Sequence, residues 1–511
     1  MTTWLEPLHD ADSMRAADVW AIEQQGVPAL ELMEAAGLAL AEGAEAVAVP
    51  GPVRIVCGKG NNGGDGLVAA RQLAATGFEV EVLLCWPREE LATDAAANLD
   101  RFEGTVRELG DGEAESALAG SGAVVDAIFG TGFSEAPRDP AAAAIEAING
   151  CGAPVIAADI ASGVDASTGE VAGGAVEATL TVSFHAAKRG HWIAPGKRHR
   201  GELRVAPIGI PAGGPAAAPG GLIAPGALSL APRRDADSTK FSSGQVVIAG
   251  GSRGLTGAVC MAAEASCRAG AGYATVAVPD ELEQIFEVKL TEVMSVGCES
   301  RAGGLATTAA PRIVEAARGA GAAVVGPGLG RGDGAAELVG ELARRIEAPL
   351  VLDADGLNAI GEDLEQLAAR SATIVLTPHA GELGRLLGID SAEVGAHRLA
   401  SAREAAQRAG AVVVLKGDDT IVVGPDGAPA INGLESPALA TAGTGDVLTG
   451  ILAALLARGL PPLEAASAAV YAHARAGRIA AKRIGMTEAV LATDVIAAIA
   501  AGLDPRAEEP A

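Results

Sequence analysis

The sequence has few cysteines, and none of them lies at a spacing typical of a metal or redox site. The six are Cys57, Cys85, Cys151, Cys260, Cys267 and Cys298. Cysteines scattered in this way are expected to be reduced and mostly buried, and to behave as small hydrophobic residues. We therefore assign chemistry to none of them.

Long apolar runs and positive charge are also scarce. No apolar stretch reaches the length of a membrane-spanning helix, and residues 1–7 lack the basic segment followed by an apolar one that marks a signal peptide. With 38 basic against 64 acidic residues, the net charge is -26. This balance works against binding nucleic acid or anionic membranes, so local donors must hold any anionic ligand. We expect a soluble cytoplasmic enzyme without membrane or nucleic-acid partners. We also expect a homo-oligomer, whose interface cannot be identified in so alanine-rich a chain.

What the chain does have is length and a repeating α/β pattern. Its 511 residues exceed the size at which single cores stop growing, and the 49% of hydrophobic residues excludes disorder. Short β-branched runs alternate with Ala-rich amphipathic stretches, which predicts parallel sheets covered by helices. The expected strands of the first half lie at 53–57, 78–85, 123–129, 154–160 and 179–184. Before them, 12–47 predicts two helices broken around Gly26, Val27 and Pro28.

A second alternation begins after a stretch made almost entirely of Pro, Gly and Ala. Its expected strands lie at 245–249, 273–278, 322–325, 349–352, 373–376 and 411–415. The stretch from Pro211 to Gly221 carries no charge and cannot build a core, so it indicates a linker. We predict domains at 1–211 and 229–503, a linker at 212–228 and a tail at 504–511. No internal repeat is visible.

The first Gly-rich motif, GKGNNGGDG at 58–66, follows a predicted strand and precedes a helix. It contains the GxGxxG pattern that admits a pyrophosphate at a helix N-terminus. The amides of Asn61 and Asn62 and the carboxylate of Asp65 exceed what a pyrophosphate loop needs, and they suit coordination of a metal by oxygen. The alternative is a purely structural turn.

Two further predicted strands end in carboxylates. The segments DAIFGTG at 126–132 and DIASGVD at 159–165 place Asp126 and Asp159 after apolar strand residues. Such carboxylates are costly to bury without a role, and ligands of doubly wound sheets bind beyond the carboxyl ends of the strands. Each Asp alone could cap a helix or form a turn, but three polar strand ends together predict a ligand site.

These three motifs, in this order, resemble the signatures of the NAD(P)H-hydrate epimerase family over about residues 10–211. The resemblance implies a Rossmann-like domain in which Asp159 is the catalytic acid and base. It implies a potassium ion held by Asn62, Asp126 and Ser162. Contacts to the hydrated nucleotide are implied for Asn61, Asn62, Gly63, Gly64, Asp65, Gly130, Thr131, Gly132, Phe133, Ser134, Glu135, Ala136 and Asp159. Ala161 stands where the family commonly has proline, which removes no functional group.

The second half has its own polar strand ends. GGSRGLTGA at 250–258 and GPGLG at 326–330 are equally compatible with structural and functional turns. In DADGLN at 353–358, the acids Asp353 and Asp355 could form turns or lie near a magnesium-bound phosphate. His379 follows a strand in a Pro- and Gly-bounded turn, which favours ligand contact over a structural role. Lys416 could offset nucleotide charge, or it could be a surface lysine in a β-turn.

The segment ATAGTGD at 440–446 runs directly into an apolar helix. Gly443 and Gly445 allow backbone N–H groups to approach an anion at the positive end of that helix. Thr444 or Asp446 could simply cap the helix. If the site is functional, Asp446 is placed to take a proton from a hydroxyl beside a phosphate that is being transferred.

Together these motifs closely resemble the ADP/ATP-dependent NAD(P)H-hydrate dehydratase family over about residues 231–501. The resemblance implies a ribokinase-like α/β domain with Asp446 as the catalytic base and Mg²⁺ accompanying ADP or ATP. Contacts to the hydrate are implied for Ala258, Gly328, His379 and Asp446. Contacts to the adenine nucleotide are implied for Lys416, Gly417, Asp418, Asp419, Thr420 and Gly445. Thr239 stands where the family often has histidine, so we assign it no role.

The sequence thus predicts a bifunctional repair enzyme for hydrated NADH and NADPH, an epimerase fused to a dehydratase. Two alternatives belong to other classes. One is a ribokinase-like vitamin kinase fused to a nucleotide-binding module, and the other is a non-catalytic nucleotide sensor.

Overall fold

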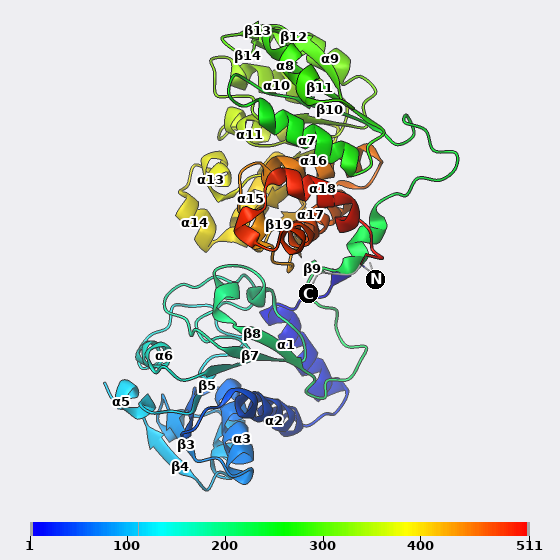
Figure 1. Ribbon diagram of the computed structural model, residues 1–511. Coiled ribbons are helices and arrows are strands. Elements are labelled where there is room, and N and C mark those ends of the chain that lie inside the picture. Colours follow the sequence, from blue (N-terminus) through cyan, green and yellow to red (C-terminus); the bar gives the residue numbers. More distant parts are fainter. Residues whose placement is uncertain (1–3, 111, 508–511) are drawn as a thin grey trace. The chain divides into compact units, whose positions relative to one another are not determined.

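The structure is a computed structural model that describes residues 4–110 and 112–507. The chain divides into two compact units (Figure 1). The first unit comprises Pro7–Pro219, and the second joins the residues up to Glu6 to those from Gly220 onward. Strand β1 (Leu5–Glu6) pairs with β9 (Gly221–Ile223) in the second unit. The first unit is therefore inserted in the sequence between two paired strands of the second.

The boundaries differ from those expected from composition. The structure assigns residues 4–6 to the second unit, and β9 lies inside the expected linker at 212–228. Strand β9 pairs with β1 and with β20 (Pro429–Ile431), so the end of the Pro-, Gly- and Ala-rich stretch forms part of a sheet. The expected tail at 504–511 is also held in part, because Arg475 donates to the carbonyl oxygens of Asp504 and Ala507.

The first unit has a seven-stranded sheet whose neighbouring strands are all parallel, in the order β4-β3-β2-β5-β6-β7-β8. The strands are β2 (Val53–Cys57), β3 (Val80–Leu84), β4 (Thr105–Glu108), β5 (Ala123–Ala127), β6 (Val155–Ala158), β7 (Leu180–Phe184) and β8 (Glu202–Ala206). The five strands predicted in this half are confirmed. The edge strands β4 and β8 carry charged and exposed residues, so their sequences lack the apolar runs of the buried strands.

Helices cover both faces of this sheet, as the alternation along β2 requires. Ile55 packs in one core with residues of α2 (Ala29–Val47), α3 (Asn61–Ala75) and α4 (Thr93–Leu99). Its neighbour Val56 packs in the other core with α5 (Ala114–Leu118) and α6 (Ala141–Gly150). Helix α1 (Ala11–Val19) continues as the π-helical turn η1 (Trp20–Gln24) and is separated from α2, which confirms the predicted break.

The second unit has an eleven-stranded sheet in the order β1-β9-β20-β19-β18-β17-β16-β15-β10-β11-β12. The strands not yet given are β10 (Gln245–Ala249), β11 (Tyr273–Pro279), β12 (Met294–Cys298), β15 (Ala322–Val325), β16 (Leu350–Leu352), β17 (Ile374–Leu376), β18 (Val412–Leu415) and β19 (Ile421–Val423). The strands from β18 to β12 are parallel, whereas β19 pairs antiparallel with β18 and with β20. All six strands predicted in this half are confirmed.

One large core of this unit joins Val246 and Ile248 of β10 to the helices α7 (Thr256–Arg268), α16 (Thr444–Ala457), α17 (Pro462–Ile484) and α18 (Ala492–Gly502). The other helices are α8 (Glu283–Lys289), α9 (Ala310–Ala316), α10 (Ala335–Arg345), α11 (Asp355–Ile360), α12 (Glu365–Ala368), α13 (Ala380–Leu387), α14 (Ser391–Ala396) and α15 (Arg398–Ala409). Strands β13 (Ser300–Arg301) and β14 (Gly304–Leu305) form a small hairpin.

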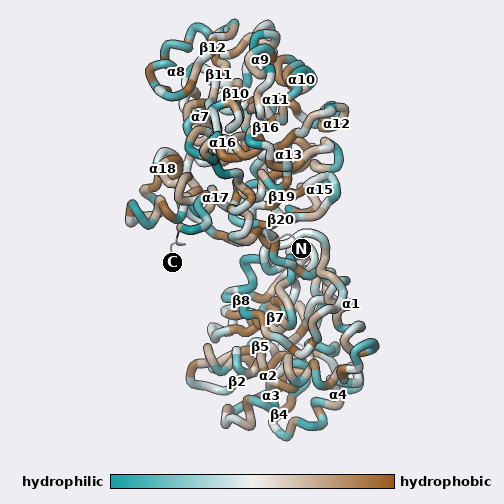
Figure 2. Tube along the Cα trace, turned by 90° about the vertical axis from the view of Figure 1, so that its right-hand side faces the viewer, coloured by the Kyte–Doolittle hydropathy of each residue, from teal (hydrophilic) through white to brown (hydrophobic). Residues whose placement is uncertain are grey.

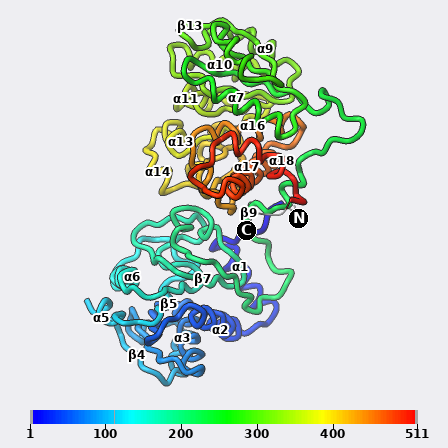
Figure 3. The backbone as a smooth tube through the Cα atoms, in the orientation of Figure 1, coloured from blue at the N-terminus to red at the C-terminus, as the bar shows by residue number. Residues whose placement is uncertain are grey.

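Hydrophobic residues concentrate inside each unit (Figure 2). Figure 3 follows the loop that leads in green from β9 to β10. The predicted α/β class is confirmed for both units. Among the described residues, no helix combines the length and the apolar character needed to cross a bilayer.

Candidate active sites

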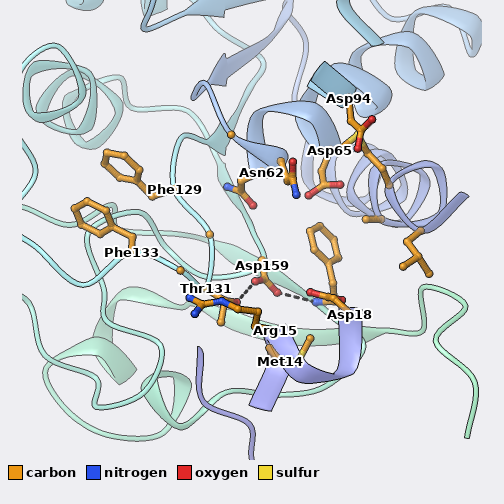
Figure 4. Close-up of a pocket in the computed structure, with 18 of the residues that line it drawn as sticks. Met14, Arg15, Asp18, Asn62, Asp65, Asp94, Phe129, Thr131, Phe133 and Asp159 are labelled. Atoms are coloured by element: carbon orange, nitrogen blue, oxygen red, sulfur yellow. Dashed lines mark hydrogen bonds between the residues drawn. The ribbon is translucent and has the colours of Figure 1, made fainter. Parts of the chain in front are cut away.

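A cavity of about 540 Å³ lies at the carboxyl ends of β2, β5 and β6 in the first unit (Figure 4). The strand order of the sheet reverses between β2 and β5, which is where doubly wound sheets bind ligands. Residues of α1 contribute another part of the lining, including Met14, Arg15 and Asp18. The cavity is thus formed by strand ends and by the N-terminal helix.

Most of the residues predicted for the hydrated nucleotide line this cavity. They are Asn61, Asn62, Asp65, Gly130, Thr131, Gly132, Phe133 and Asp159. Gly63 and Gly64 are buried instead. A Cβ on Gly63 would lie 2.0 Å from the Gly58 carbonyl oxygen, and one on Gly64 would lie 2.6 Å from Met33 Cε. Ser134, Glu135 and Ala136 are exposed and outside the lining.

Asp159 occupies the centre of the polar end of the cavity. Its backbone is left-handed, with φ 68°. Its carboxylate accepts hydrogen bonds from the Thr131 hydroxyl, the Lys188 ammonium and the Phe184 N–H, the last at 3.1 Å. Burial alone would raise the pKa of Asp159, but the Lys188 charge and these hydrogen bonds lower it on balance. Asp159 is therefore an ionised carboxylate.

Lys188 is wholly buried beneath Asp159, with 0% of its surface exposed. Besides Asp159, its ammonium donates to Ser183 Oγ and to the Phe184 carbonyl oxygen, both at 2.9 Å. A buried ammonium needs such compensation, and these partners use all three of its donors. Lys188 fixes both the position and the charge of Asp159.

His191 connects the backbones of this pair. The Lys188 N–H donates to His191 Nδ1 at 3.0 Å. His191 Nε2 lies 3.0 Å from the Asp159 carbonyl oxygen. One ring nitrogen accepts and the other must donate, so the ring is neutral. Burial, with the Lys188 charge, lowers the pKa of His191 to about 3. The geometry and the protonation state agree.

Of the residues predicted to hold potassium, Asp126 and Ser162 are fully buried and hydrogen-bonded to each other, whereas Asn62 lines the cavity. Ser162 donates from its hydroxyl to Asp126 Oδ1 at 2.6 Å and from its N–H to Asp126 Oδ2 at 2.9 Å. Burial raises the pKa of Asp126 to about 6, against the hydrogen bonds that lower it. The buried Asn62 Nδ2 has no hydrogen-bond partner in the described part of the chain. Asn62 also neighbours Gly130, because a Cβ there would lie 3.0 Å from Asn62 Oδ1.

The opposite end of the cavity is aromatic. Phe129 and Phe133 stack with ring centroids 4.0 Å apart and planes 9° apart, and Trp86 lies 6.0 Å from Phe129. Figure 4 shows both phenylalanines on the far side from Asp65. A flat ring could stack there, while the carboxylates face a polar group.

In the second unit, Lys416 at the end of β18 links three elements. Its ammonium lies 3.0 Å from Asp353 Oδ1 after β16 and 3.6 Å from Glu382 Oε2 on α13. Burial alone would lower the pKa of Lys416, but these two carboxylates raise it on balance. A Cβ on Gly445 would lie 3.6 Å from this ammonium. The structure thus brings the predicted nucleotide residues Lys416 and Gly445 together.

Asp446 lies in the first turn of α16 without capping it. The N-cap is Gly443, with φ 90° and no side-chain hydrogen bond. Thr444 does not cap either, because its hydroxyl lies against the carbonyl oxygens of Leu439 at 2.7 Å and Thr441 at 2.9 Å. Burial and the charge of Asp353 raise the pKa of Asp446 to about 7. This carboxylate is therefore poised to exchange a proton near neutral pH.

The remaining residues predicted to contact the hydrate lie in two places: Ala258 and Gly328 are neighbours, and His379 begins α13. A Cβ on Gly328 would lie 3.3 Å from Ala258 Cβ, so these two residues are neighbours. His379 is the N-cap of α13, and its Nδ1 accepts the N–H groups of Gly381 at 3.0 Å and Glu382 at 3.3 Å. Burial, above all, lowers the pKa of His379, in agreement with an accepting Nδ1. The structural alternative for His379 is thus observed, and its half-exposed ring also places Nε2 3.5 Å from Glu382 Oε1.

The loop at 416–420, with the sequence KGDDT, is held on its buried side by an ion pair. Asp419 is 0% exposed and accepts from Arg398, whose Nη2 lies 2.7 Å from Asp419 Oδ1. The Thr420 hydroxyl donates to the Gly417 carbonyl oxygen at 2.7 Å, which closes the turn, whereas Asp418 is exposed. Asp419 and Thr420 position this loop, and Gly417 and Asp418 form its surface.

Comparisons with known proteins decide the family. The family model described as NAD(P)H-hydrate dehydratase matches residues 246–501, and the one described as YjeF-related protein N-terminus matches residues 29–190. The bifunctional NAD(P)H-hydrate repair enzyme of Moorella thermoacetica is 40% identical over 501 residues, covering 95% of this chain and 94% of the relative. The chain belongs to the bifunctional NAD(P)H-hydrate repair enzymes. The family resemblance of the sequence motifs is confirmed.

Other repair enzymes match as broadly. That of Salinibacter ruber is 40% identical over 524 residues, covering 96% of this chain and 95% of the relative. A solved structure, the ADP/ATP-dependent NAD(P)H-hydrate dehydratase of Bacillus subtilis co-crystallised with ATP/Mg²⁺, is 27% identical. That match covers 54% of this chain and 94% of that chain, with a TM-score of 0.46.

Sequence reasoning missed several residues at the sites of this repair-enzyme chain. Lys188 holds the carboxylate of Asp159 in the first site. The only sign of this role in the sequence is that a lysine follows shortly after the strand β7. Glu382 is another residue to which the sequence analysis assigns no role, although its carboxylate lies 3.6 Å from the Lys416 ammonium. For Asp353 the sequence allows a turn or a place near a magnesium-bound phosphate, and the structure shows a buried carboxylate that connects several elements. It is 1% exposed and accepts hydrogen bonds from Thr377 at 2.8 Å and Thr449 at 2.7 Å as well as pairing with Lys416.

Proposed function

We propose that this chain repairs hydrated NADH and NADPH in two steps. The first unit interconverts the R and S epimers. The second unit dehydrates the S epimer to NADH or NADPH at the expense of ADP or ATP, giving AMP or ADP and phosphate. The observation that carries the proposal is the carboxylate of Asp446. It lies in the first turn of α16 without capping the helix, has a pKa of about 7 and is close to Lys416. The names of its closely similar repair enzymes support it.

The first site suits epimerisation. Addition of water to a dihydronicotinamide leaves a hydroxyl on the carbon next to the ring nitrogen, and inversion requires proton transfers as this hydroxyl leaves and returns. Asp159 is the proposed acid and base. The proposed hydrate contacts are those predicted from the sequence. Gly63 and Gly64 would act by allowing close packing. The exposed loop beside the lining consists of Ser134, Glu135 and Ala136.

Asn62, Asp126 and Ser162 would hold the potassium ion. They fit it because carboxylate, hydroxyl and amide oxygens are the ligands of hard cations, and because the carboxylate of Asp126 is fully buried beside the Ser162 hydroxyl. The ion would supply positive charge beside the buried Asp126. The chain's own residues hold the loops at 126–132 and 159–165 together through the Ser162 and Asp126 hydrogen bonds.

The second site suits activation of a hydroxyl. Hydroxide leaves carbon poorly at neutral pH and phosphate leaves well, so phosphorylation of the hydrate permits elimination. Asp446 would take the hydroxyl proton, while the N–H groups at Gly443 and Gly445 stabilise the transferring charge. Ala258, Gly328 and His379 would contact the hydrate. Lys416, Gly417, Asp418 and Gly445 would face ADP or ATP, with Asp419 and Thr420 shaping the loop. Mg²⁺ would accompany the nucleotide phosphates.

The decisive experiment supplies hydrated NADH to the full chain with ADP or ATP. We expect dihydronicotinamide absorbance to return and one phosphate to be released for each turnover. Asp446→Asn should lower the rate about 10²–10⁴-fold. Asp426→Asn, which changes an exposed turn residue, is the control and should leave the rate unchanged.

The alternatives make different predictions in the same assay. A vitamin kinase would accumulate a stable phosphorylated product without recovery of absorbance. A nucleotide sensor would bind ligand without turnover. Unchanged turnover in Asp446→Asn would disprove the proposed base even if the nucleotide bound normally.

We also propose a cytoplasmic homo-oligomer. All six cysteines are free thiols, which fits a reducing compartment. Light scattering on the purified chain would test the oligomer, and fractionation of cells would test the compartment.

A further inference from the structure

Helix α1 brings a third carboxyl group to the first site. Asp18 lines the cavity and is half-buried. No hydrogen bond or ion pair is formed by its carboxyl group among residues 4–110 and 112–507, whereas its helix neighbour Asp12 faces Arg15 at 3.8 Å. Figure 4 shows Asp18 beside Asp159. An unpaired carboxyl therefore faces the same space as the proposed acid and base.

The charges around Asp18 come from four elements. Asp159 after β6 and Lys188 after β7 both act on it electrostatically. Asp65 on α3 interacts with Asp18 and with Asp159, and Arg15 lies one turn earlier on α1. Burial, followed by the charge of Asp159, raises the pKa of Asp18 to about 6, whereas Lys188 lowers it. Asp18 therefore binds a proton more readily than Asp159, although the two line one cavity.

Asp65 is the competing candidate for proton transfer. It is 9% exposed, and its carboxyl also lacks a partner in the described chain. Burial, above all, raises the pKa of Asp65 well above its ordinary value. A neutral carboxyl is suited to donate a hydrogen bond to the substrate. Asp18 is less buried than Asp65 and lies beside Asp159, so it is the better placed of the two for proton transfer.

We propose that Asp18 is the second proton-transfer residue of the epimerase site and acts together with Asp159 on the hydroxyl-bearing carbon. This inference rests on the proposed epimerase function. Environments that separate the protonation of two carboxyls assign one as acid and the other as base.

The step balances with water as co-reactant. Asp18 gives its proton to the hydroxyl as the C–O bond breaks, and the ring-nitrogen electron pair forms a C=N bond. Water then adds to the opposite face, its proton goes to Asp159, and the electron pair returns to nitrogen. One water leaves, one enters, and one proton has moved from Asp18 to Asp159. The reverse direction exchanges the two roles.

The test follows the interconversion of separated epimers by the full chain in water enriched in heavy oxygen. For the unaltered chain, each inversion should introduce one solvent oxygen. Asp18→Asn should lower kcat for inversion by about 10²-fold or more with little change in KM. Asp12→Asn is the matched control, because it makes the same change on the exposed side of α1. A near-UV spectrum and a thermal midpoint like those of the unaltered chain would show that Asp18→Asn folds.

Three results would overturn the inference. Inversion by Asp18→Asn at the unaltered rate would leave Asp159 sufficient, and a loss confined to KM would make Asp18 a binding residue. Inversion without uptake of solvent oxygen would exclude the departure of the hydroxyl. These differ from failure of the proposed function itself, in which the unaltered chain would not interconvert the epimers.

Discussion

Individual carboxylates in the two sites have opposite environments. Asp159 is held ionised by a buried ammonium, whereas Asp446 is kept close to half-protonation by burial and by the charge of Asp353. The first arrangement fixes a charge, and the second prepares a proton exchange. Their difference leads to two predictions.

The proposed dehydratase rate should fall in mild acid. Asp446 must be ionised to act as a base, and its pKa is about 7. The value of kcat/KM should therefore fall about tenfold for each pH unit below this pKa. Because Glu382 contributes to raising that pKa, Glu382→Gln should move the descending limb to lower pH. Glu404→Gln on α15, where Glu404 faces Arg408, is the control. A limb that stays in place in Glu382→Gln would contradict the assignment.

Lys188→Met should destabilise the first unit and reverse its pH response. In the unaltered chain the pKa of Asp159 is lowered, so its stabilisation is present above the unfolded pKa and is lost as pH falls. Without the ammonium, burial should raise that pKa, and stability should be lost as pH rises. Removal of one partner of a buried pair costs about 3–5 kcal/mol.

Urea unfolding at two pH values measures this effect. Trp20, Trp86 and Trp192 report mainly on the first unit. Lys59→Met is the matched control, because Lys59 pairs with Glu90 at 3.0 Å on the surface and such pairs contribute about 0–1 kcal/mol. Equal losses in both variants would contradict the role of Lys188.

At the level of elements, the sites depend on how closely helices approach strands. Helix α3 carries Asn61, Asn62 and Asp65, and its Gly66 faces β2 and β5. A Cβ on Gly66 would lie 2.6 Å from Ala127 Cβ and 3.2 Å from Cys57 Sγ. The glycine therefore determines how deeply the start of α3 enters the switch point of the sheet.

Gly66→Ala should cost about 1–3 kcal/mol through overpacking, and it should reduce epimerisation by displacing Asn62 and Asp65. The urea midpoint and the epimerase rate measure the two effects. Gly150→Ala at the end of α6 is the control, because no atom lies within 4 Å of its added Cβ. If Gly66→Ala behaved like this control, the close approach would not matter.

The elements also differ in how far the sequence alone predicts them. Buried strands such as β2 and β18 are short apolar runs followed by polar residues, so their positions and site residues are visible locally. The edge strands β4 and β8 and the partners Lys188 and Glu382 are not, because their roles depend on neighbours far away in the sequence. The same holds for Asp419, for which the family resemblance implies nucleotide contact, because its partner Arg398 lies on a separate helix.

For the whole molecule, the N-terminus stabilises the unit that is completed last. Trp4 is buried in the core of the second unit with Ile223 and Leu228. Trp4→Ala should therefore cost the second unit about 3–5 kcal/mol and leave the first unit unchanged. Dehydratase and epimerase activities remaining after graded heating would measure the two units separately. Val49→Ala, at an exposed apolar residue of the first unit, is the control. Greater loss of epimerase activity in Trp4→Ala would contradict this assignment.

The pairing of Leu5 with Ile223 also constrains synthesis and engineering. The ribosome releases β1 long before β9, so this edge of the second sheet must wait until the entire first unit has emerged. Because β1 and β9 are adjacent and antiparallel, a short hairpin turn in place of residues 7–219 would preserve both strands. A second unit shortened to begin at residue 229 would lose both of them and expose β20 as a new edge open to aggregation.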